Sequence, residues 1–235
     1  MTQTQPLPTD LQALFERQRA HRWTAAQSTP AQRQAILRRL HDAVRARRGQ
    51  LADALRADLG KSRAEAEVTE LHPVLEEIQH AIRRLPRWMA PRRVDTPVVL
   101  AGARSEIQPQ ARGVTLVLSP WNYPVNLALA PLVASLAAGN TVILKPSEKA
   151  PNVARALREL LEATFDPALV AVVEGGADAA RALTELPFDH IFFTGSTAVG
   201  KHVMRAASAN LTSVRSEEHT LNSSHRCISY AVFCL

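Results

Sequence analysis

Residues 113–148 read GVTLVLSPWNYPVNLALAPLVASLAAGNTVILKPSE, and this stretch decides the fold. Two short apolar runs, VTLVL at 114–118 and TVILK at 141–145, flank a helical segment from Pro124 to Ala138. Runs that are apolar throughout are typical of strands buried on both faces of a sheet, and parallel neighbours need a crossover between them. The stretch therefore predicts a strand, a helix and a second, parallel strand.

The same alternation continues toward the C-terminus. Apolar runs recur at 170–173 and 190–193, and helical patterns lie at 151–164, near 178–183 and from about Thr197. Alternating strands and helices imply right-handed parallel crossovers, with helices on both faces of the sheet. We predict an α/β fold with a doubly wound parallel sheet over 114–214.

The residues before the sheet are predicted to be helical through residue 93. Thr9 or Asp10 can cap a first helix, and Thr29-Pro30 is a signal for the start of a second. Apolar positions recur at helical spacing over 31–59 and over 71–88. We expect Pro86 and Pro91 to close the last of these helices.

Residues 94–113, VDTPVVLAGARSEIQPQARG, have a different pattern. They carry β-branched residues, a Gly-containing turn and polar–apolar alternation. This pattern predicts a β-hairpin arm.

Length, composition and cysteine content exclude several classes of protein. The chain has 235 residues, of which 46% are hydrophobic, which is enough to bury a core. It has no signal-peptide pattern and no uninterrupted apolar run of about 18 residues, so we expect no membrane span and a cytoplasmic location. Its 2 cysteines, Cys227 and Cys234, cannot form a disulfide framework or a four-thiolate metal site, and we expect no metal.

The formal net charge of +6 raises the alternative of a nucleic-acid partner. Arginines crowd the first part of the chain at Arg17, Arg19, Arg22, Arg33, Arg38, Arg39, Arg45, Arg47 and Arg48. Between residues 31 and 59 they fall between the apolar positions, as on the solvated outer face of a helix. Because no nucleic-acid-binding motif accompanies them, we expect no nucleic-acid partner.

Polar residues and glycines follow each of the four predicted strands. In a doubly wound sheet the ligand lies beyond the carboxyl ends of the strands, so these loops are expected to converge on one site. They are Ser119-Pro120-Trp121-Asn122, Lys145-Pro146-Ser147-Glu148, Gly175-Gly176 and Thr194-Gly195-Ser196.

The first loop contains PWNYP at 120–124, where two prolines enclose a Trp and an Asn. Because the prolines stiffen the loop, the amide of Asn122 can be a preorganised donor to an oxygen that becomes negative during a reaction. The residue can equally be the N-cap of the helix that begins near Pro124. Spacing alone leaves both interpretations open.

The other two motifs are suited to a nucleotide. In LKPSE at 144–148, Lys145 and Glu148 can bind ribose hydroxyls, although an ordinary cap with a surface ion pair also fits. In FTGSTAVG at 193–200, backbone N–H groups at a helix start attract pyrophosphate. The G-x-x-x-x-G spacing is not that of G-x-G-x-x-G, and no Lys-Ser/Thr follows it as in a P-loop.

Together these three motifs, in this order and spacing, closely resemble the aldehyde dehydrogenase superfamily. Over about 11–214 the sequence looks most like its class 3, which includes fatty and coniferyl aldehyde dehydrogenases. The resemblance implies oxidation of an aldehyde to a carboxylic acid with NAD or NADP. It implies that Asn122 is the oxyanion-hole residue. The candidate cofactor-binding residues are Trp121, Lys145, Ser147, Glu148, Gly195, Ser196, Thr197 and Gly200.

The family's chemistry needs a cysteine that forms a thiohemiacetal and a glutamate base. In the family, the segment matching 210–214 is followed by a Leu-Glu-Leu-Gly-Gly-Lys motif that carries the glutamate, and the cysteine lies further on. Here Val214 is followed by RSEEHTLNSSHRCISYAVFCL. Neither residue stands at a matching position, and Cys227 has no family context.

Residues 215–235 resemble a translated sequencing adapter. The DNA AGATCGGAAGAGCACACG encodes RSEEHT, and ATCTCGTATGCCGTCTTCTGCTTG encodes ISYAVFCL, with the remaining adapter and an index between them. We therefore expect this tail to be an artefact outside the fold.

The resemblance thus implies the N-terminal fragment of a class 3-like enzyme whose catalytic domain is missing. Residues 114–214 would then be its Rossmann-like dinucleotide-binding domain, in truncated form. We expect this chain to be inactive and its full-length parent to act on a small-molecule aldehyde as a homodimer. The alternative is a non-catalytic dinucleotide-binding fragment. The choice between NAD and NADP stays open, although Glu148 near the ribose would disfavour a 2′-phosphate.

Overall fold

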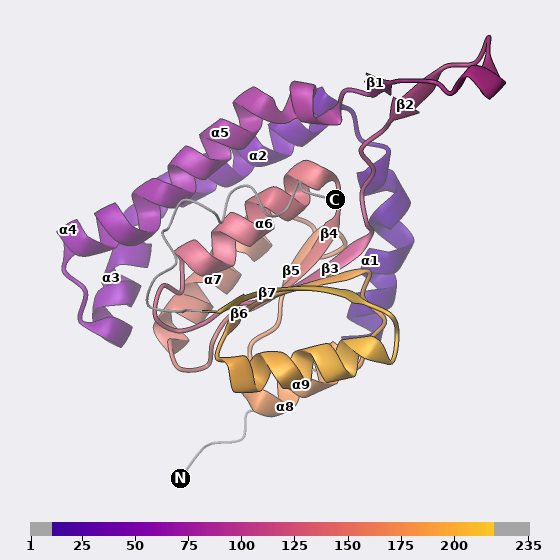
Figure 1. The fold of residues 1–235 in the computed structure, drawn as a ribbon. Coiled ribbons are helices and arrows are strands. Elements are labelled where there is room, and N and C mark those ends of the chain that lie inside the picture. The colour runs from indigo at the N-terminus through magenta and orange to yellow at the C-terminus, as the bar shows by residue number, and fades with distance from the viewer. Residues whose placement is uncertain (1–10, 219–235) are drawn as a thin grey trace.

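The structure is a computed structural model in which residues 11–218 are described. A five-stranded sheet lies between two layers of helices, and a hairpin projects from one end (Figure 1). The strand order is β5-β4-β3-β6-β7, and every neighbouring pair in this sheet is parallel. The strands are β3 (Val114–Leu118), β4 (Thr141–Lys145), β5 (Val170–Val172), β6 (His190–Gly195) and β7 (Ser213–Glu218). The predicted doubly wound α/β fold is confirmed.

The strand order contains one reversal. From the central β3 the chain winds outward through β4 to β5, then crosses to the other side of β3 for β6 and β7. Leu118 at the end of β3 pairs with Lys145 of β4 and with Phe193 of β6, so the carboxyl ends of these three strands lie side by side. The reversal between β3 and β6 is the place where doubly wound sheets bind ligands.

Alternate residues of the strands build two separate cores. Val117 and Phe192 belong to one cluster, whereas their neighbours Leu118 and Phe193 belong to the other. The main helices of the first cluster are α2 (Pro30–Ala46), α3 (Arg48–Leu59), α5 (His72–Met89), α6 (Asn126–Ala138) and α7 (Pro151–Thr164). Those of the second are α1 (Leu11–Ala26), α8 (Ala177–Thr184) and α9 (Thr197–Ser208). Both faces of the strands are therefore buried, which explains why their sequences are apolar throughout.

The helical stripe predicted over 31–59 is two helices, because α2 ends at Ala46 and α3 begins at Arg48. The predicted start of α2 is confirmed. Thr29 Oγ1 accepts a hydrogen bond from the N–H of Gln32 at 3.3 Å, and Gln32 Oε1 accepts one from the N–H of Thr29 at 2.7 Å. This reciprocal pair is a capping box.

The expectation that Pro86 ends its helix is wrong, because α5 continues to Met89. A proline within a helix cannot donate to the carbonyl four residues earlier, which here belongs to Ile82. Gln34 Nε2 of α2 donates to that carbonyl at 2.8 Å instead. A side chain from a neighbouring helix thus compensates for the missing backbone hydrogen bond.

The interpretation of the arginines as a solvated face is wrong for Arg33. This residue of α2 is 6% exposed, and its guanidinium donates to the carbonyls of Ala26 at 2.8 Å and Ala137 at 3.1 Å. Both carbonyls lie near the C-terminal ends of helices, where unpaired carbonyl groups and the negative end of the dipole favour a cation. Arg33 therefore joins α1, α2 and α6.

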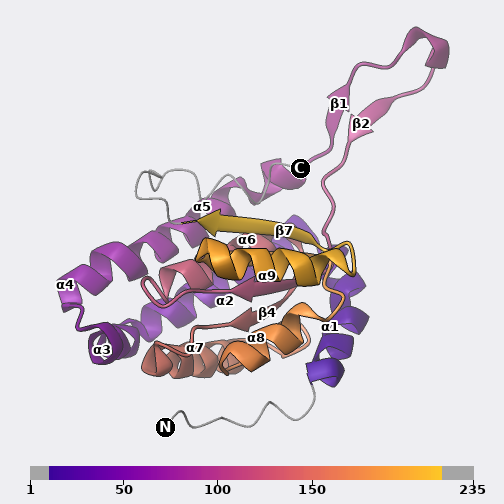
Figure 2. The same cartoon turned by 60° about the horizontal axis from the view of Figure 1, so that its bottom comes forward.

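The predicted hairpin arm is present, but it starts earlier than residue 94: α5 ends at Met89, and the first strand of the arm already begins at Arg92, where helix was expected. Its strands, β1 (Arg92–Val94) and β2 (Ser105–Ile107), pair antiparallel, and a short 3₁₀ turn (Val98–Leu100) lies near the tip. Figure 2 shows the arm projecting away from the sheet and its helices.

The edge strand β7 is absent from the sequence prediction. It pairs with β6 from Ser213↔His190 to Glu218↔Gly195. The expected domain boundary at residue 214 therefore falls inside a strand, and 215–218 of the presumed artefactual tail pair with the sheet. The rest of that tail, with Cys227 and Cys234, lies outside the described residues.

Candidate functional site

Three of the four predicted loops meet at the carboxyl edge of the sheet around the β3–β6 reversal. The N–H of Ser119, just after β3, donates to the carbonyl of Lys145 at the end of β4 at 3.2 Å. The loop after β6 lies on the other side of β3. Gly175-Gly176 follows β5, which is one strand further out. The parallel register thus brings together residues far apart in the sequence.

Lys145 and Glu148 form an ion pair at this edge. Lys145 is 5% exposed, and its Nζ donates to Glu148 Oε2 at 3.1 Å and to the carbonyl of Pro146 at 3.0 Å. Burial alone would raise the pKa of Glu148, but a hydrogen bond from its own backbone N–H and the charge of Lys145 outweigh this and lower it. The carboxylate is therefore negative at neutral pH.

The LKPSE segment does not cap the following helix through Ser147 or Glu148. The hydroxyl of Ser147, which is 8% exposed, accepts a hydrogen bond from the N–H of Lys149 at 3.3 Å. The N–H of Val153 in the first turn of α7 donates to Asp58 Oδ2 at 2.8 Å. The capping interpretation of this segment is wrong, because the carboxylate of Asp58 in α3 accepts the hydrogen bond from the first turn of α7 instead.

The turn into α9 is shaped by one aromatic ring. A Cβ on Gly195 would lie 2.6 Å from Phe193 Cζ, and one on Gly200 would lie 3.3 Å from Phe193 Cε1. A side chain at Gly195 would therefore force the ring to move, whereas one at Gly200 would make a tight contact with it. Ser196 caps α9, and Ser196 and Thr197 are both exposed at the helix start, where the positive end of the dipole favours an anion.

Two buried hydroxyl oxygens lie at the reversal itself. Ser119 directly follows β3 and is 8% exposed. Thr194 lies near the end of the adjacent strand β6 and is 4% exposed. Within residues 11–218, Ser119 Oγ and Thr194 Oγ1 have no hydrogen-bond partner. A buried polar atom without a partner costs about 1–3 kcal/mol, so these hydroxyls are suited to a ligand. Their position directly after an apolar run was the sequence signal.

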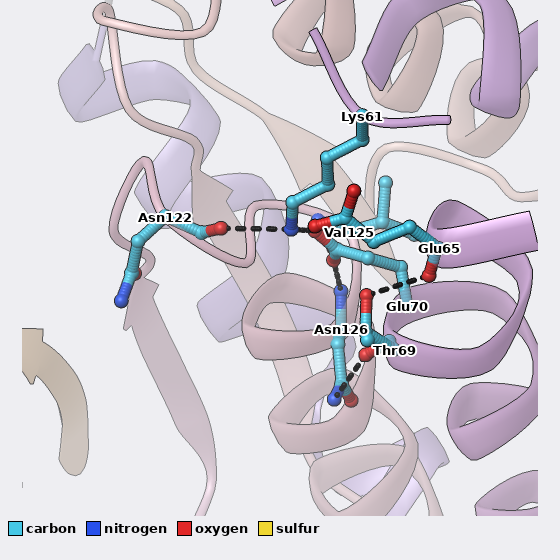
Figure 3. Close-up of polar contacts among 7 residues, drawn as sticks. All are labelled: Lys61, Glu65, Thr69, Glu70, Asn122, Val125 and Asn126. Carbon is cyan, nitrogen blue, oxygen red and sulfur yellow. Dashed lines mark hydrogen bonds and ion pairs between the residues drawn. The ribbon is translucent and has the colours of Figure 1, made fainter. Parts of the chain in front are cut away.

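The loop that carries Asn122 is contacted by two buried charged side chains, Lys61 and Glu70. The helix α6 begins at Asn126, and its first N–H groups, those of Val125 and Asn126, donate to Glu70 Oε2 at 3.1 and 2.9 Å (Figure 3). Of the two interpretations of Asn122, the helix cap is therefore wrong. Its backbone carbonyl accepts a hydrogen bond from Lys61 Nζ at 2.9 Å.

Neither Lys61 nor Glu70 belongs to a motif, so sequence analysis missed both.

Trp121, which precedes Asn122 in the loop after β3, is 49% exposed. Within residues 11–218, no three His, Cys, Asp or Glu side chains form a group that could hold a metal ion. The helices of this described part include none that is long and apolar enough to cross a membrane.

Comparison with known proteins identifies the family. The model of the Aldehyde dehydrogenase family matches residues 8–223. This chain belongs to the aldehyde dehydrogenase family. Its members are NAD(P)-dependent oxidoreductases.

Individual relatives confirm the class 3-like resemblance. The chain is 40% identical to a probable coniferyl aldehyde dehydrogenase of Pseudomonas aeruginosa over 218 residues, 92% of this chain and 46% of that protein. It is 42% identical to human aldehyde dehydrogenase family 3 member B1 over 212 residues, 90% of this chain and 44% of that protein. The chain thus spans less than half the length of these relatives.

A solved structure has the same fold. The structure of Staphylococcus aureus AldH in a substrate-bound state matches with a TM-score of 0.86 and 39% identity. The match covers 88% of this chain and 45% of that one. The fold is therefore that of the cofactor-binding domain of aldehyde dehydrogenases.

The residues at the sheet edge fit a dinucleotide. Ser119 and Thr194 offer two buried hydroxyls to a polar ligand at the reversal. The pair of Lys145 and Glu148 offers donors and acceptors together, as ribose hydroxyls require. The start of α9 offers N–H groups to phosphate oxygens.

Proposed function

We propose that this chain supplies the cofactor-binding part of an NAD- or NADP-dependent enzyme that oxidises a small-molecule aldehyde to a carboxylic acid. The observation that carries the proposal is the buried Lys145 ammonium, paired with Glu148 at the carboxyl edge beside the β3–β6 reversal. A buried lysine of this kind is costly unless it serves a ligand or a fixed partner. The family membership and the fold both support this assignment.

Each proposed site residue has a separate task. Lys145 and Glu148 bind ribose hydroxyls, with Ser147 fixing the turn between them. Ser196 and Thr197 present the start of α9 to pyrophosphate, and Gly195 and Gly200 let that turn pack on Phe193. When bound, the cofactor supplies a nicotinamide ring that accepts a hydride from the substrate.

Asn122 is proposed to donate its side-chain amide to the aldehyde oxygen as negative charge develops on that atom. Donors fixed in place before the reaction stabilise such charge most effectively, and removal of one costs about 2.7–4 kcal/mol in known enzymes. Trp121, exposed beside it, is proposed to cover the cofactor.

For the isolated 235-residue polypeptide we infer cofactor binding without turnover. The chemistry of the family needs a cysteine thiolate as the nucleophile. The 2 cysteines of this chain, Cys227 and Cys234, lie in the tail and not at the family position. The test is NAD(P)H formation with a panel of aldehydes. No turnover above background is expected, and turnover by the purified chain would contradict the inference.

We propose that the arm takes part in the homodimer of the full-length parent. Its tip carries Val98 and Val99, each 90% exposed, and apolar groups presented this way are typical of interaction surfaces. Sedimentation of the chain and of a Val98→Ser/Val99→Ser variant tests this. Weaker self-association of the variant is expected, whereas equal self-association of the two would contradict a role of the arm in the dimer.

A further inference from the structure

A buried ion pair lies directly behind the loop that carries Asn122. Lys61 is 8% exposed and Glu70 is 0% exposed, and Lys61 Nζ lies 2.6 Å from Glu70 Oε1 (Figure 3). Removing two charges from water costs several kcal/mol per ion, and the attraction between them offsets this only when their other polar groups are also satisfied. The remaining contacts of the pair therefore indicate what it stabilises.

The ammonium of Lys61 contacts the loop at two consecutive residues. It donates to the backbone carbonyl of Asn122 at 2.9 Å. It also lies 4.1 Å from the centre of the Tyr123 ring, within the range of a cation–π interaction. Lys61 itself follows Gly60, the C-cap of α3, so it reaches the loop from a different part of the chain.

The carboxylate of Glu70 contacts the other end of the same loop. Its Oε2 accepts hydrogen bonds from the N–H groups of Val125 and Asn126. Glu70 lies in a π-helical turn (Glu67–Leu71) between α4 (Arg63–Ala66) and α5. Single π-turns inside helices are frequent at functional sites.

A helix cap alone does not account for this arrangement. A serine or an aspartate could satisfy the start of α6 without a buried lysine. The lysine neutralises the capping carboxylate of Glu70, and it also holds the carbonyl of Asn122. Figure 3 shows the side chain of Asn122 directed away from Lys61, on the opposite side of the loop. Holding the carbonyl fixes the backbone from which the side chain of Asn122 projects.

We propose that Lys61 and Glu70 are positioning residues, which hold the loop from both ends and so fix the amide of Asn122 for its oxygen ligand. The proposal rests on the proposed role of Asn122. It requires neither residue to touch substrate or cofactor. Both act through the backbone of the loop.

The test uses the full 235-residue chain and a neutral double variant, Lys61→Met/Glu70→Gln. This variant leaves no unpaired buried charge, and its glutamine can still accept from the start of α6. It lacks the donor to the carbonyl of Asn122. The NMR order parameter of the Asn122 side-chain amide is expected to fall from about 0.85 to below about 0.6, with the unfolding midpoint little changed.

Arg48 and Glu67 provide the matched control, because Glu67 lies in the same π-turn and pairs with Arg48 away from the loop. The Arg48→Met/Glu67→Gln variant is expected to leave the Asn122 amide rigid. A folded Lys61→Met/Glu70→Gln variant with a rigid Asn122 amide would overturn the proposal, as would equal loosening by the control.

The wild-type chain provides a test that needs no variant to fold. Its Asn122 amide is expected to be as rigid as the backbone of the sheet, and an order parameter below about 0.6 would overturn the proposal. Since none of these measurements requires cofactor, failure of NAD(P) binding would reject the proposed function and leave this result separate.

Discussion

Lys145 Nζ and Glu148 Oε2 lie 3.1 Å apart, yet the two side chains differ in exposure, 6% for the lysine and 46% for the glutamate. The lysine is thus fixed at the end of β4, whereas the glutamate faces solvent. A cofactor bound at this edge, as proposed, would meet a buried cation and an accessible anion. Because Glu148 is the more exposed of the two, a 2′-phosphate at this edge would be repelled by its carboxylate before it reached the lysine.

Glu148→Gln is expected to shift cofactor preference toward NADP. The pKa of Glu148 is lowered, so the carboxylate is charged at neutral pH and repels a phosphate. Removing one repulsive contact of about 1 kcal/mol should improve NADP affinity roughly fivefold relative to NAD. Titrations with both cofactors measure this ratio. Glu159→Gln on the exposed face of α7 is the control, and an unchanged ratio in Glu148→Gln would place the carboxylate away from the ribose.

Gly195→Ala is expected to destabilise the chain by about 1–3 kcal/mol, because the new Cβ would lie 2.6 Å from Phe193 Cζ. The ring must move, and a smaller residue should relieve the clash. Urea unfolding of Gly195→Ala, Phe193→Leu and the double variant gives the coupling energy, with about 1 kcal/mol or more expected. Gly49→Ala, where the added Cβ meets nothing within 4 Å, is the control. Independent effects of the two substitutions would show that the ring does not require this glycine.

Gln34→Ala is expected to lower the free energy of unfolding by about 1–2 kcal/mol, since it leaves the partly buried carbonyl of Ile82 without its donor. The loss should shrink when Pro86→Ala restores the backbone N–H that normally binds this carbonyl. A double-mutant cycle by denaturant unfolding measures the difference. An equal cost of Gln34→Ala in both backgrounds would rule out the compensation described for α5.

His190 is expected to make the fold less stable in mild acid. Burial, together with the charge of Arg112, lowers the pKa of His190 from 6.5 to about 4, so the folded state keeps the ring neutral. Between these pH values the unfolded state binds the extra proton, and stability falls as the pH falls. The slope contributed is at most about 1.4 kcal/mol per pH unit, and less because the ring is only partly buried.

Unfolding of wild type and His190→Gln from pH 7 to pH 4 measures this contribution. The stability of wild type should fall more steeply over that range, and the exposed His202→Gln should follow wild type. Parallel curves for wild type and His190→Gln would contradict the assignment.

The central sheet was predictable because both of its cores bury strands such as Val114–Leu118, whose apolar runs are visible in sequence. The edge strand β7 was not, because Ser213–Glu218 has a mostly polar sequence that an edge position tolerates. The burial of individual charged residues could not be predicted from the sequence either. Arg33 and Glu70 look like surface residues until helices distant in sequence supply their partners.

The candidate site divides in the same way. Lys145 and Glu148 stand three residues apart beside a strand, so local sequence contains the pair. The support of Asn122 comes from Lys61 and Glu70, and contacts over that sequence separation arise only from packing. No local pattern indicates them.

Calorimetric titration of the 235-residue chain with NAD and NADP tests most directly whether this chain forms a dinucleotide site around Lys145. We predict saturable binding to one site, weakened at least tenfold, or about 1.4 kcal/mol, by Lys145→Met. Absence of detectable binding at millimolar concentrations of either cofactor, or equal binding by Lys145→Met, would contradict the account.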